Sequence, residues 1–138
     1  MRYLGIDPGF HGAAAQICRG RLLTHEWHST EQAWQWLRSR RLPALAVLER
    51  VTRPCKLTAN AGEWRAFLIA AEIPYVEVRP QEWQKYFGKL PKERTKRKNK
   101  LKRIAQKRFP SKKVTLANAD AILLAIYCKE NLDSGVKK

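Results

Sequence analysis

The stretch Arg2–Ala15, RYLGIDPGFHGAAA, decides the fold of this chain. Its first half predicts a short apolar strand that ends at Asp7, and the Pro-Gly pair after it turns the chain into a second strand. A carboxylate at the end of a buried strand is costly unless it binds a cation. The alternative is an aspartate that caps the turn, and the stretch alone does not separate the two.

Length and composition restrict the class of protein further. With 138 residues and 44% hydrophobic residues, the chain is long enough to bury one core, so we expect a single domain over residues 1–138. No apolar run reaches the roughly 18 residues of a membrane helix, and the first residues lack a secretory pattern, so we expect no membrane association and a cytoplasmic location. The three cysteines have no CxxC spacing, which indicates neither a disulfide framework nor a zinc site.

The net charge of +16 indicates a polyanionic partner. Between Lys89 and Lys113 there are 13 of the 28 lysines and arginines and a single acid, Glu93. This concentration is typical of proteins that bind nucleic acid, rather than membranes. A merely solvated cationic face is the alternative.

Hydrophobic periodicity predicts an α/β domain. In chain order we expect strands over 2–7, 13–18 and 21–27, a helix over 29–40, a strand over 44–49, a helix over 60–72, a strand over 75–78, and helices over 80–88, 92–109 and 116–130. Asn60 and Glu63 resemble a capping box at the start of the second helix. The basic segment Lys89–Lys100 has no apolar period, which is compatible with a mobile loop in the absence of a ligand.

Two further acids repeat the pattern of Asp7. Glu49 follows the apolar run of a strand that is predicted to be central in the sheet, although an ion pair with Arg50 or Arg53 would also explain it. Asp120 lies one turn into the last helix among apolar residues, where a helix-dipole role is the alternative. Strand-end and helix acids of this kind favour a shared metal site, with three candidate ligands.

Three segments carry a resemblance to a known family. LGIDPGFHGA at 4–13, LAVLERV at 45–51 and NADAILLAIY at 118–127 resemble the RuvC-type Holliday junction resolvases, especially their short phage-encoded relatives, within the RNase H-like superfamily. VRPQEWQKYFG at 78–88 and the basic helix follow in the expected order. The resemblance implies a mixed five-stranded sheet, three antiparallel strands and then two parallel ones, flanked by helices.

The resemblance also implies a function. It points to a homodimeric endodeoxyribonuclease that cuts four-way junctions and other branched DNA, with two Mg²⁺ ions per active site that Mn²⁺ can replace. Asp7, Glu49 and Asp120 would be the metal ligands and catalytic carboxylates, and Lys98 would be a catalytic cation near the scissile phosphate. The DNA-binding residues would be Lys89, Lys92, Arg94, Lys96, Arg97, Lys98, Lys100, Lys102 and Arg103.

The chain departs from the family pattern at one position. The family has a second acid three or four residues before Asp120, where this sequence has Ala117 and Leu116. The site would then bind its second metal weakly, recruit Glu130 or Asp133, or work with three carboxylates. A catalytically weak or inactive nucleic-acid-binding protein, and a less selective flap or fork nuclease, are therefore alternative functions.

The predicted helix over 60–72 supplies a candidate dimer interface. Trp64, Phe67 and Leu68 form an apolar stripe on one face of this helix. Such a stripe is more often part of the core than of an interface. We nevertheless expect a two-fold dimer through this stripe, because a junction needs two symmetric cuts and each chain has one site.

Overall fold

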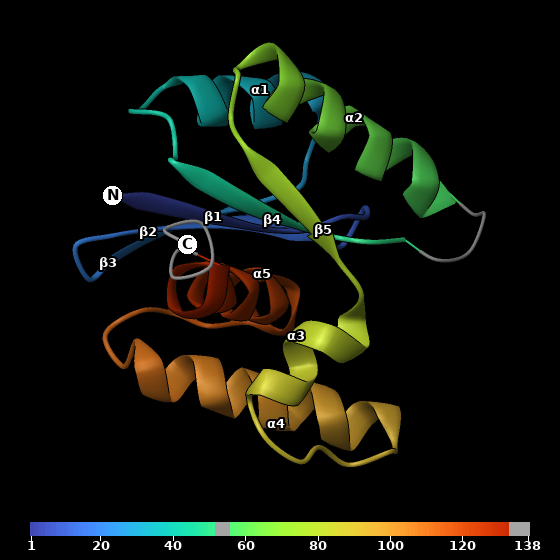
Figure 1. Ribbon diagram of the computed structural model, residues 1–138. Helices are drawn as coiled ribbons and strands as arrows, with labels where there is room; N and C mark the ends of the chain where they lie inside the picture. Colours follow the sequence, from blue (N-terminus) through green and yellow to red (C-terminus); the bar gives the residue numbers. More distant parts are fainter. Residues whose placement is uncertain (52–55, 133–138) are drawn as a thin grey trace.

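The computed structural model describes residues 1–51 and 56–132 as a mixed sheet between two layers of helices (Figure 1). The elements are β1 (Arg2–Asp7), β2 (Ala13–Cys18), β3 (Arg21–Glu26), α1 (Thr30–Arg38), β4 (Leu45–Glu49), α2 (Lys56–Ala70), β5 (Tyr75–Val78), α3 (Pro80–Tyr86), α4 (Arg94–Arg108), α5 (Leu116–Tyr127) and a π-helical turn (Cys128–Leu132). In the described ranges, no helix is both long and apolar enough to cross a membrane.

The sheet has the strand order β3-β2-β1-β4-β5. β1, β2 and β3 pair antiparallel, whereas β4 pairs parallel with both β1 and β5. The predicted fold class, three antiparallel strands followed by two parallel ones, is therefore confirmed. The parallel pairing brings the carboxyl ends of β1 and β4 to the same edge of the sheet.

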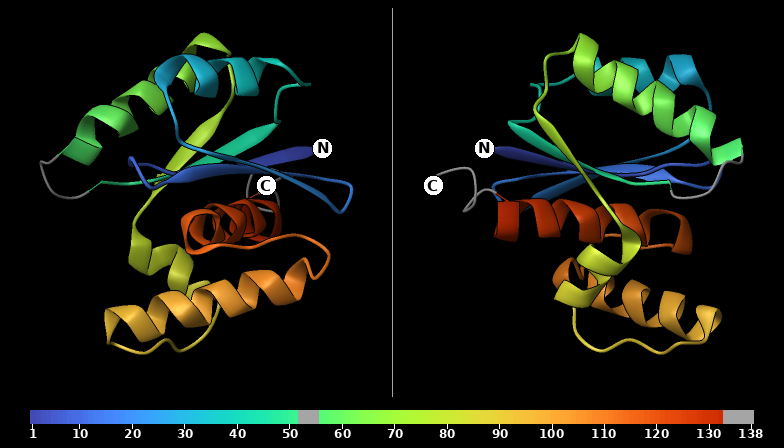
Figure 2. Two further views of the ribbon diagram at one scale, coloured as in Figure 1. Left: turned by 180° about the vertical axis from the view of Figure 1, so that it is seen from behind. Right: turned by 45° about the vertical axis from the view of Figure 1, so that its right-hand side comes forward.

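Helices cover both faces of the sheet. α1 and α2 lie on one face, while α5 lies against the other and separates the sheet from α4, as all three views show (Figures 1 and 2). Alternation along β1 divides its side chains between two cores, because Leu4 and Ile6 pack with α1 and α2 whereas Tyr3 packs on the α5 side. Asp7 has the same parity as Tyr3 and so belongs to the α5 face.

Gly5 allows α5 to lie directly on the backbone of β1. A Cβ atom at this position would come within 2.3 Å of the Ala121 carbonyl oxygen and of the Ala125 nitrogen. No real Cβ contact is that short, so only glycine permits this packing distance. The close approach places the N-terminal part of α5, with Asp120 one turn into the helix, beside the end of β1.

Several predicted boundaries are wrong. α2 begins at Lys56, so Asn60 lies inside the helix and is not its N-cap. Its buried side chain instead accepts a hydrogen bond from the Gly9 amide at 2.7 Å, and Glu63 accepts one from the Thr30 hydroxyl. α4 begins at Arg94, with Glu93 as the cap, so much of the segment Lys89–Lys100 is helical. Its mobility without DNA stays a prediction.

The predicted dimer interface is wrong at two of its three residues. Trp64 and Leu68 are 1% and 0% exposed and pack in the core between α2 and the sheet. Phe67 is half-buried, with its ring centroid 5.2 Å from that of Trp34 and 5.7 Å from that of Trp64. Trp64 and Leu68 are buried within one chain and offer no surface to a second one, so their assignment to the interface is wrong. A role for Phe67 in a dimer stays a prediction.

Candidate active site

Asp7 and Glu49 end neighbouring parallel strands on the same face of the sheet. The register pairs Ile6 with Leu48, so the two acids occupy the next position along β1 and β4. Val47, two residues before Glu49, packs in the core on the α5 side, which puts the carboxylate of Glu49 on that side as well. The strand-end acids that the sequence singled out are thus neighbours.

The turn after Asp7 is tightly built. The Gly12 amide donates to the Gly9 carbonyl at 3.0 Å, and Gly9 has a φ angle of 130°. A Cβ atom at Gly12 would lie 2.0 Å from the Asp7 carbonyl oxygen, so the turn cannot accommodate a side chain there. The hydrogen bond from Gly9 to Asn60 fixes this turn against α2. The backbone that carries Asp7 is therefore held from two sides.

Trp83 orients Glu49. The indole Nε1 of this fully buried side chain on α3 donates to Oε2 of Glu49 at 2.6 Å. The sequence pattern places Trp83 only on the aromatic side of a short helix. A buried indole needs a hydrogen-bond acceptor, and this need alone could have pointed to a polar partner for Trp83. Nothing in the sequence indicates that the acceptor is Glu49.

Asp120 completes the acidic cluster from α5. Thr115 caps this helix by accepting a hydrogen bond from the Asn118 amide, and the Asn118 side chain accepts one from the Thr115 amide. Asp120 lines the same cavity as Asp7 and Glu49, which has a volume of about 590 Å³. The three predicted carboxylates therefore share one pocket.

Burial and mutual repulsion raise the pKa values of these carboxyl groups. Burial raises the pKa of Asp7 well above its usual range, and the charges of Glu49 and Asp120 raise it further. Burial, opposed by the Trp83 hydrogen bond, raises the pKa of Glu49 to about 7. Burial also raises the pKa of Asp120. Such a cluster favours a bound cation, because a cation would offset the repulsion.

Two basic residues of α4 reach the same pocket. Lys98 and Arg94 line it, and the charge of Lys98 lowers the pKa of all three carboxyl groups. Arg97 lowers the pKa of Asp120 and donates a hydrogen bond to the Lys92 carbonyl at 2.8 Å. The predicted proximity of Lys98 to the carboxylates is what the structure shows; its catalytic role stays a proposal.

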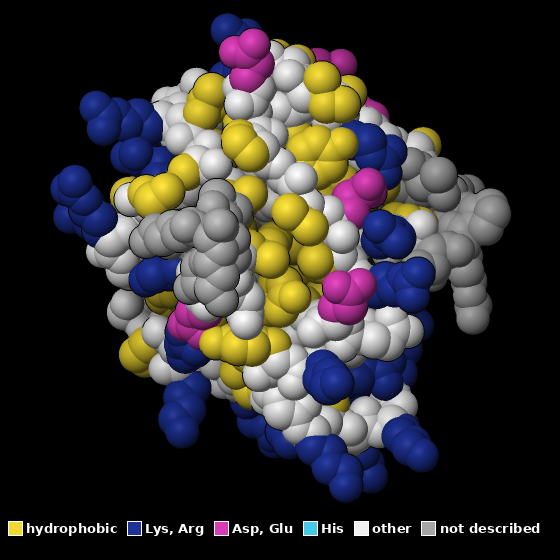
Figure 3. All heavy atoms as spheres, in the orientation of Figure 1, with side chains coloured by type: hydrophobic (Ala, Val, Ile, Leu, Met, Phe, Trp, Pro, Cys, Tyr) yellow, Lys and Arg dark blue, Asp and Glu magenta, His cyan; other side chains and the backbone are white. Residues whose placement is uncertain are grey.

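The other predicted DNA-binding residues do not line this pocket. Lys89 and Lys92 precede α4, while Lys96, Lys100, Lys102 and Arg103 lie along the helix. Lys100 donates to the Lys89 carbonyl at 2.8 Å and so fastens the preceding segment to the helix. Lysines and arginines crowd the lower edge of the molecule over α4 (Figure 3). Leu101 and Ala105 form the opposite, buried side of α4.

Phe10, His11 and Gln84 also line the pocket, and they were not among the predicted site residues. Phe10 is 57% exposed, which is unusual for a phenylalanine. Phe10 and His11 follow the first-strand acid within the turn, so their place in the chain could have pointed to them. Gln84 comes from α3, and nothing in the sequence indicated that it would lie in this pocket.

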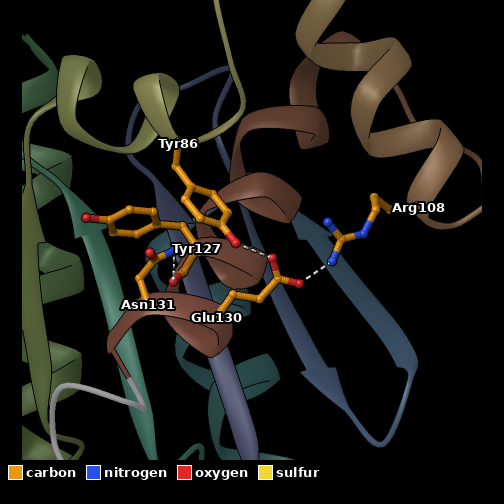
Figure 4. A network of polar contacts seen from close by, with 5 residues as sticks. All are labelled: Tyr86, Arg108, Tyr127, Glu130 and Asn131. Carbon is orange, nitrogen blue, oxygen red and sulfur yellow. Dashed lines mark hydrogen bonds and ion pairs between the residues drawn. The ribbon is translucent and has the colours of Figure 1, made fainter.

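Glu130 does not supply a fourth carboxylate. It accepts a hydrogen bond from the Tyr86 hydroxyl at 2.7 Å and pairs with Arg108, far along the chain from Asp120 (Figure 4). Ten residues of helix separate the two acids by roughly 15 Å. Glu130 therefore joins α3, α4 and the π-helical turn, which argues against the alternative that the site recruits it. Asp133, the other residue named in that alternative, lies outside the described residues.

The donor set of the pocket suits a hard divalent cation. Carboxylate oxygens are the ligands that Mg²⁺ and Mn²⁺ prefer. In the described part of the chain, no three acidic, histidine or cysteine side chains converge closely enough to form a ready-made metal site. The Glu49 carboxylate accepts the hydrogen bond from Trp83, and burial, more than the neighbouring charges, raises the pKa of Asp7. The residue types fit the metal, and the carboxylates would have to turn toward it on binding.

The sheet order and helix layers define an RNase H-like fold. No protein-family model matches the sequence, and no curated protein matches it either. Among solved structures, RuvC from Thermus thermophilus is similar over 98% of this chain and 97% of that one, with a TM-score of 0.67 and 17% identity. Fowlpox virus resolvase, solved with its substrate Holliday junction DNA, is similar over 96% and 99%, with a TM-score of 0.67 and 12% identity. At this identity, the likeness establishes the fold.

Proposed function

We propose that this chain is a metal-dependent endonuclease that cuts branched DNA, with four-way junctions as its preferred substrate. The observation that carries the proposal is the pocket in which β1, β4 and α5 bring Asp7, Glu49 and Asp120 together beside Lys98. The net charge of +16 supports a polyanionic substrate. The fold likeness to RuvC and to fowlpox virus resolvase, both solved with Holliday junction DNA, supports the branched form.

The three carboxylates would hold the metal, for which we propose two Mg²⁺ or Mn²⁺ ions. Bound divalent ions supply a metal-activated water for attack on phosphorus and stabilise charge on the leaving oxygen. Trp83 holds the Glu49 carboxylate in place through its indole hydrogen bond. The ionised forms bind cations, so the raised pKa values predict metal binding that strengthens as pH rises through about 7 for Glu49.

Lys98 and the basic face of α4 would bind the DNA strand. Lys98 lines the pocket, so its ammonium group can offset charge that develops on the phosphate during cleavage. The exposed lysines and arginines along α4 would neutralise neighbouring phosphates. These contacts carry no base specificity, which agrees with selection of a DNA shape over a sequence.

We also propose that the active form is a homodimer. A four-way junction has near two-fold symmetry and needs two cuts, whereas each chain has one carboxylate pocket among its described residues. Trp64 and Leu68 are buried within the chain and so are not part of that interface.

A binding protein that does not cut is the second candidate. The observation that favours it is the absence of a carboxylate at Leu116 and Ala117, which leaves three acids in the pocket as described. Both candidates bind branched DNA, so only cleavage separates them.

The test uses labelled four-way junctions, flaps, forks and linear duplexes, each with Mg²⁺ and with EDTA. We expect Mg²⁺-dependent, paired and symmetric nicks in the junction and little cutting of linear DNA. Binding without cleavage would favour the second candidate. Equal cutting of flaps, forks and junctions would favour a less selective nuclease.

A further inference from the structure

A second basic pocket lies at the end of the sheet opposite the carboxylates. It has a volume of about 1020 Å³, and five arginines and one glutamine contribute to its lining: Arg2, Gln16, Arg19, Arg21, Arg40 and Arg41. Arg2 begins β1 and Asp7 ends it, so the two pockets are separated by a strand length of roughly 17 Å. Neither the proposed cleavage nor the basic face of α4 uses these residues.

The sheet register assembles this pocket. Arg2 pairs with Cys18, and Cys18 pairs in turn with Arg21, so the two arginines flank one position of β2. The Ala44 amide donates to the Arg2 carbonyl at 2.8 Å, which holds the segment between α1 and β4, with its two arginines, beside the start of β1. Arg19 adds its side chain from the hairpin turn, where its φ angle is 50°. The arginines therefore come from four different places in the chain.

The charges of this pocket are not compensated within the described residues. The ion pairs among the described residues are Arg65–Glu77 and Arg108–Glu130. None of the arginines that line the pocket takes part in either pair. No acid belongs to the lining over these same residues. Five like charges at one site repel one another, and an anion would relieve that repulsion.

Gln16 adds a largely buried polar group to the pocket. The residue is 4% exposed and lines the pocket beside the arginines. Its side-chain amide can donate a hydrogen bond to an oxyanion bound there.

We propose that this pocket binds backbone phosphates of nucleic acid, as a second contact for DNA remote from the carboxylates. The planar guanidinium group pairs with phosphate through two parallel hydrogen bonds. The described lining contains no aromatic side chain on which a base could stack, so phosphate and not base recognition is expected. Lysines and arginines also gather at the left of the molecule, where the β2–β3 hairpin lies, apart from those over α4 (Figure 3). The inference rests on the proposed function, since it assigns a further contact to the same substrate.

The test is the salt dependence of DNA binding by the full chain, measured in EDTA so that no cleavage occurs. The variant is Arg40→Gln/Arg41→Gln, whose two side chains are exposed and lie outside helices and strands. The matched control is Lys85→Gln/Lys129→Gln, which removes the same charge from exposed positions on the other side of the sheet. Binding of a labelled four-way junction is followed between 50 and 200 mM salt.

We expect the slope of log affinity against log salt to become shallower by about 0.9 for each phosphate that the arginine variant no longer neutralises. The control should keep a slope close to that of the unaltered protein. Equal slopes for variant and control would overturn the inference. Displacement of the DNA by sodium triphosphate at equal phosphate concentration would also overturn it, because the ligand would then be a free polyphosphate.

The outcomes separate this inference from the proposed function. A slope difference in a protein that cuts none of the substrates would support the phosphate pocket and refute the nuclease. Junction cleavage with no slope difference would support the nuclease and refute the pocket.

Discussion

Replacing Glu49 by glutamine should stabilise the metal-free protein. Glu49 is buried at the end of β4, and its carboxylate repels that of Asp7. Glutamine keeps an oxygen that can accept the hydrogen bond from Trp83 and removes the buried charge. The same substitution removes a proposed metal ligand, so stability and cleavage should change in opposite directions.

The magnitude follows from the pKa. A carboxyl pKa raised from 4.5 to about 7 in the folded state corresponds to about 3 kcal/mol of destabilisation. The folded state binds the proton more tightly than the unfolded state, so this destabilisation is absent below pH 4.5. It grows as pH rises to about 7 and is complete above that. We therefore expect a gain of up to about 3 kcal/mol in the free energy of unfolding at pH 8 and none at pH 4.

The assay is urea unfolding in EDTA at both pH values, with Glu72→Gln as the matched control, because Glu72 is exposed. The control should leave the free energy of unfolding unchanged to within about 0.5 kcal/mol. A Glu49→Gln variant that is no more stable than the unaltered protein at pH 8 would refute the reasoning. Added Mg²⁺ should narrow the difference, because the metal stabilises only the chain that binds it.

Three other changes test the construction of the site. Gly5→Ala should lower the free energy of unfolding by about 3 kcal/mol or more, because the new methyl group meets the backbone of α5; a smaller decrease in urea unfolding would contradict the packing. Trp83→Phe should move the rise of cleavage to higher pH, since it removes the indole hydrogen bond that lowers the pKa of Glu49; an unchanged pH profile would exclude Trp83 as a residue that tunes this pKa. Ala117→Asp should raise cleavage at low Mg²⁺ by adding a ligand one turn before Asp120, and no gain across a metal titration would indicate that three carboxylates suffice.

The strands and the strand-end acids could be predicted because their signals are local. β1, β2 and β5 have the predicted limits, since apolar runs between turn residues mark both ends. The meeting of Asp7 and Glu49 follows from one rule, that parallel neighbours end at the same edge of a sheet.

The errors arose where tertiary contacts override local signals. Asn60 has the chemistry of an N-cap, but its side chain binds the Gly9 amide, which is distant in sequence. The first half of α4, by contrast, is helical for local reasons that hydrophobic periodicity does not detect, because its lysines and arginines have good helix propensity and Glu93 caps it. The stripe around Trp64 could not be assigned to core or interface from periodicity, which is the same for both.

The measurement that tests the central claim most directly is junction cleavage by Asp7→Asn, Glu49→Gln and Asp120→Asn, with junction binding measured in parallel. Each variant should lose cleavage at saturating Mg²⁺, because each acid of the shared pocket is a proposed metal ligand. Each should bind the junction at least as tightly as the unaltered protein, since a negative charge near phosphate is removed. Cleavage by any of the three at the unaltered rate would contradict the claim that these carboxylates form one catalytic metal site.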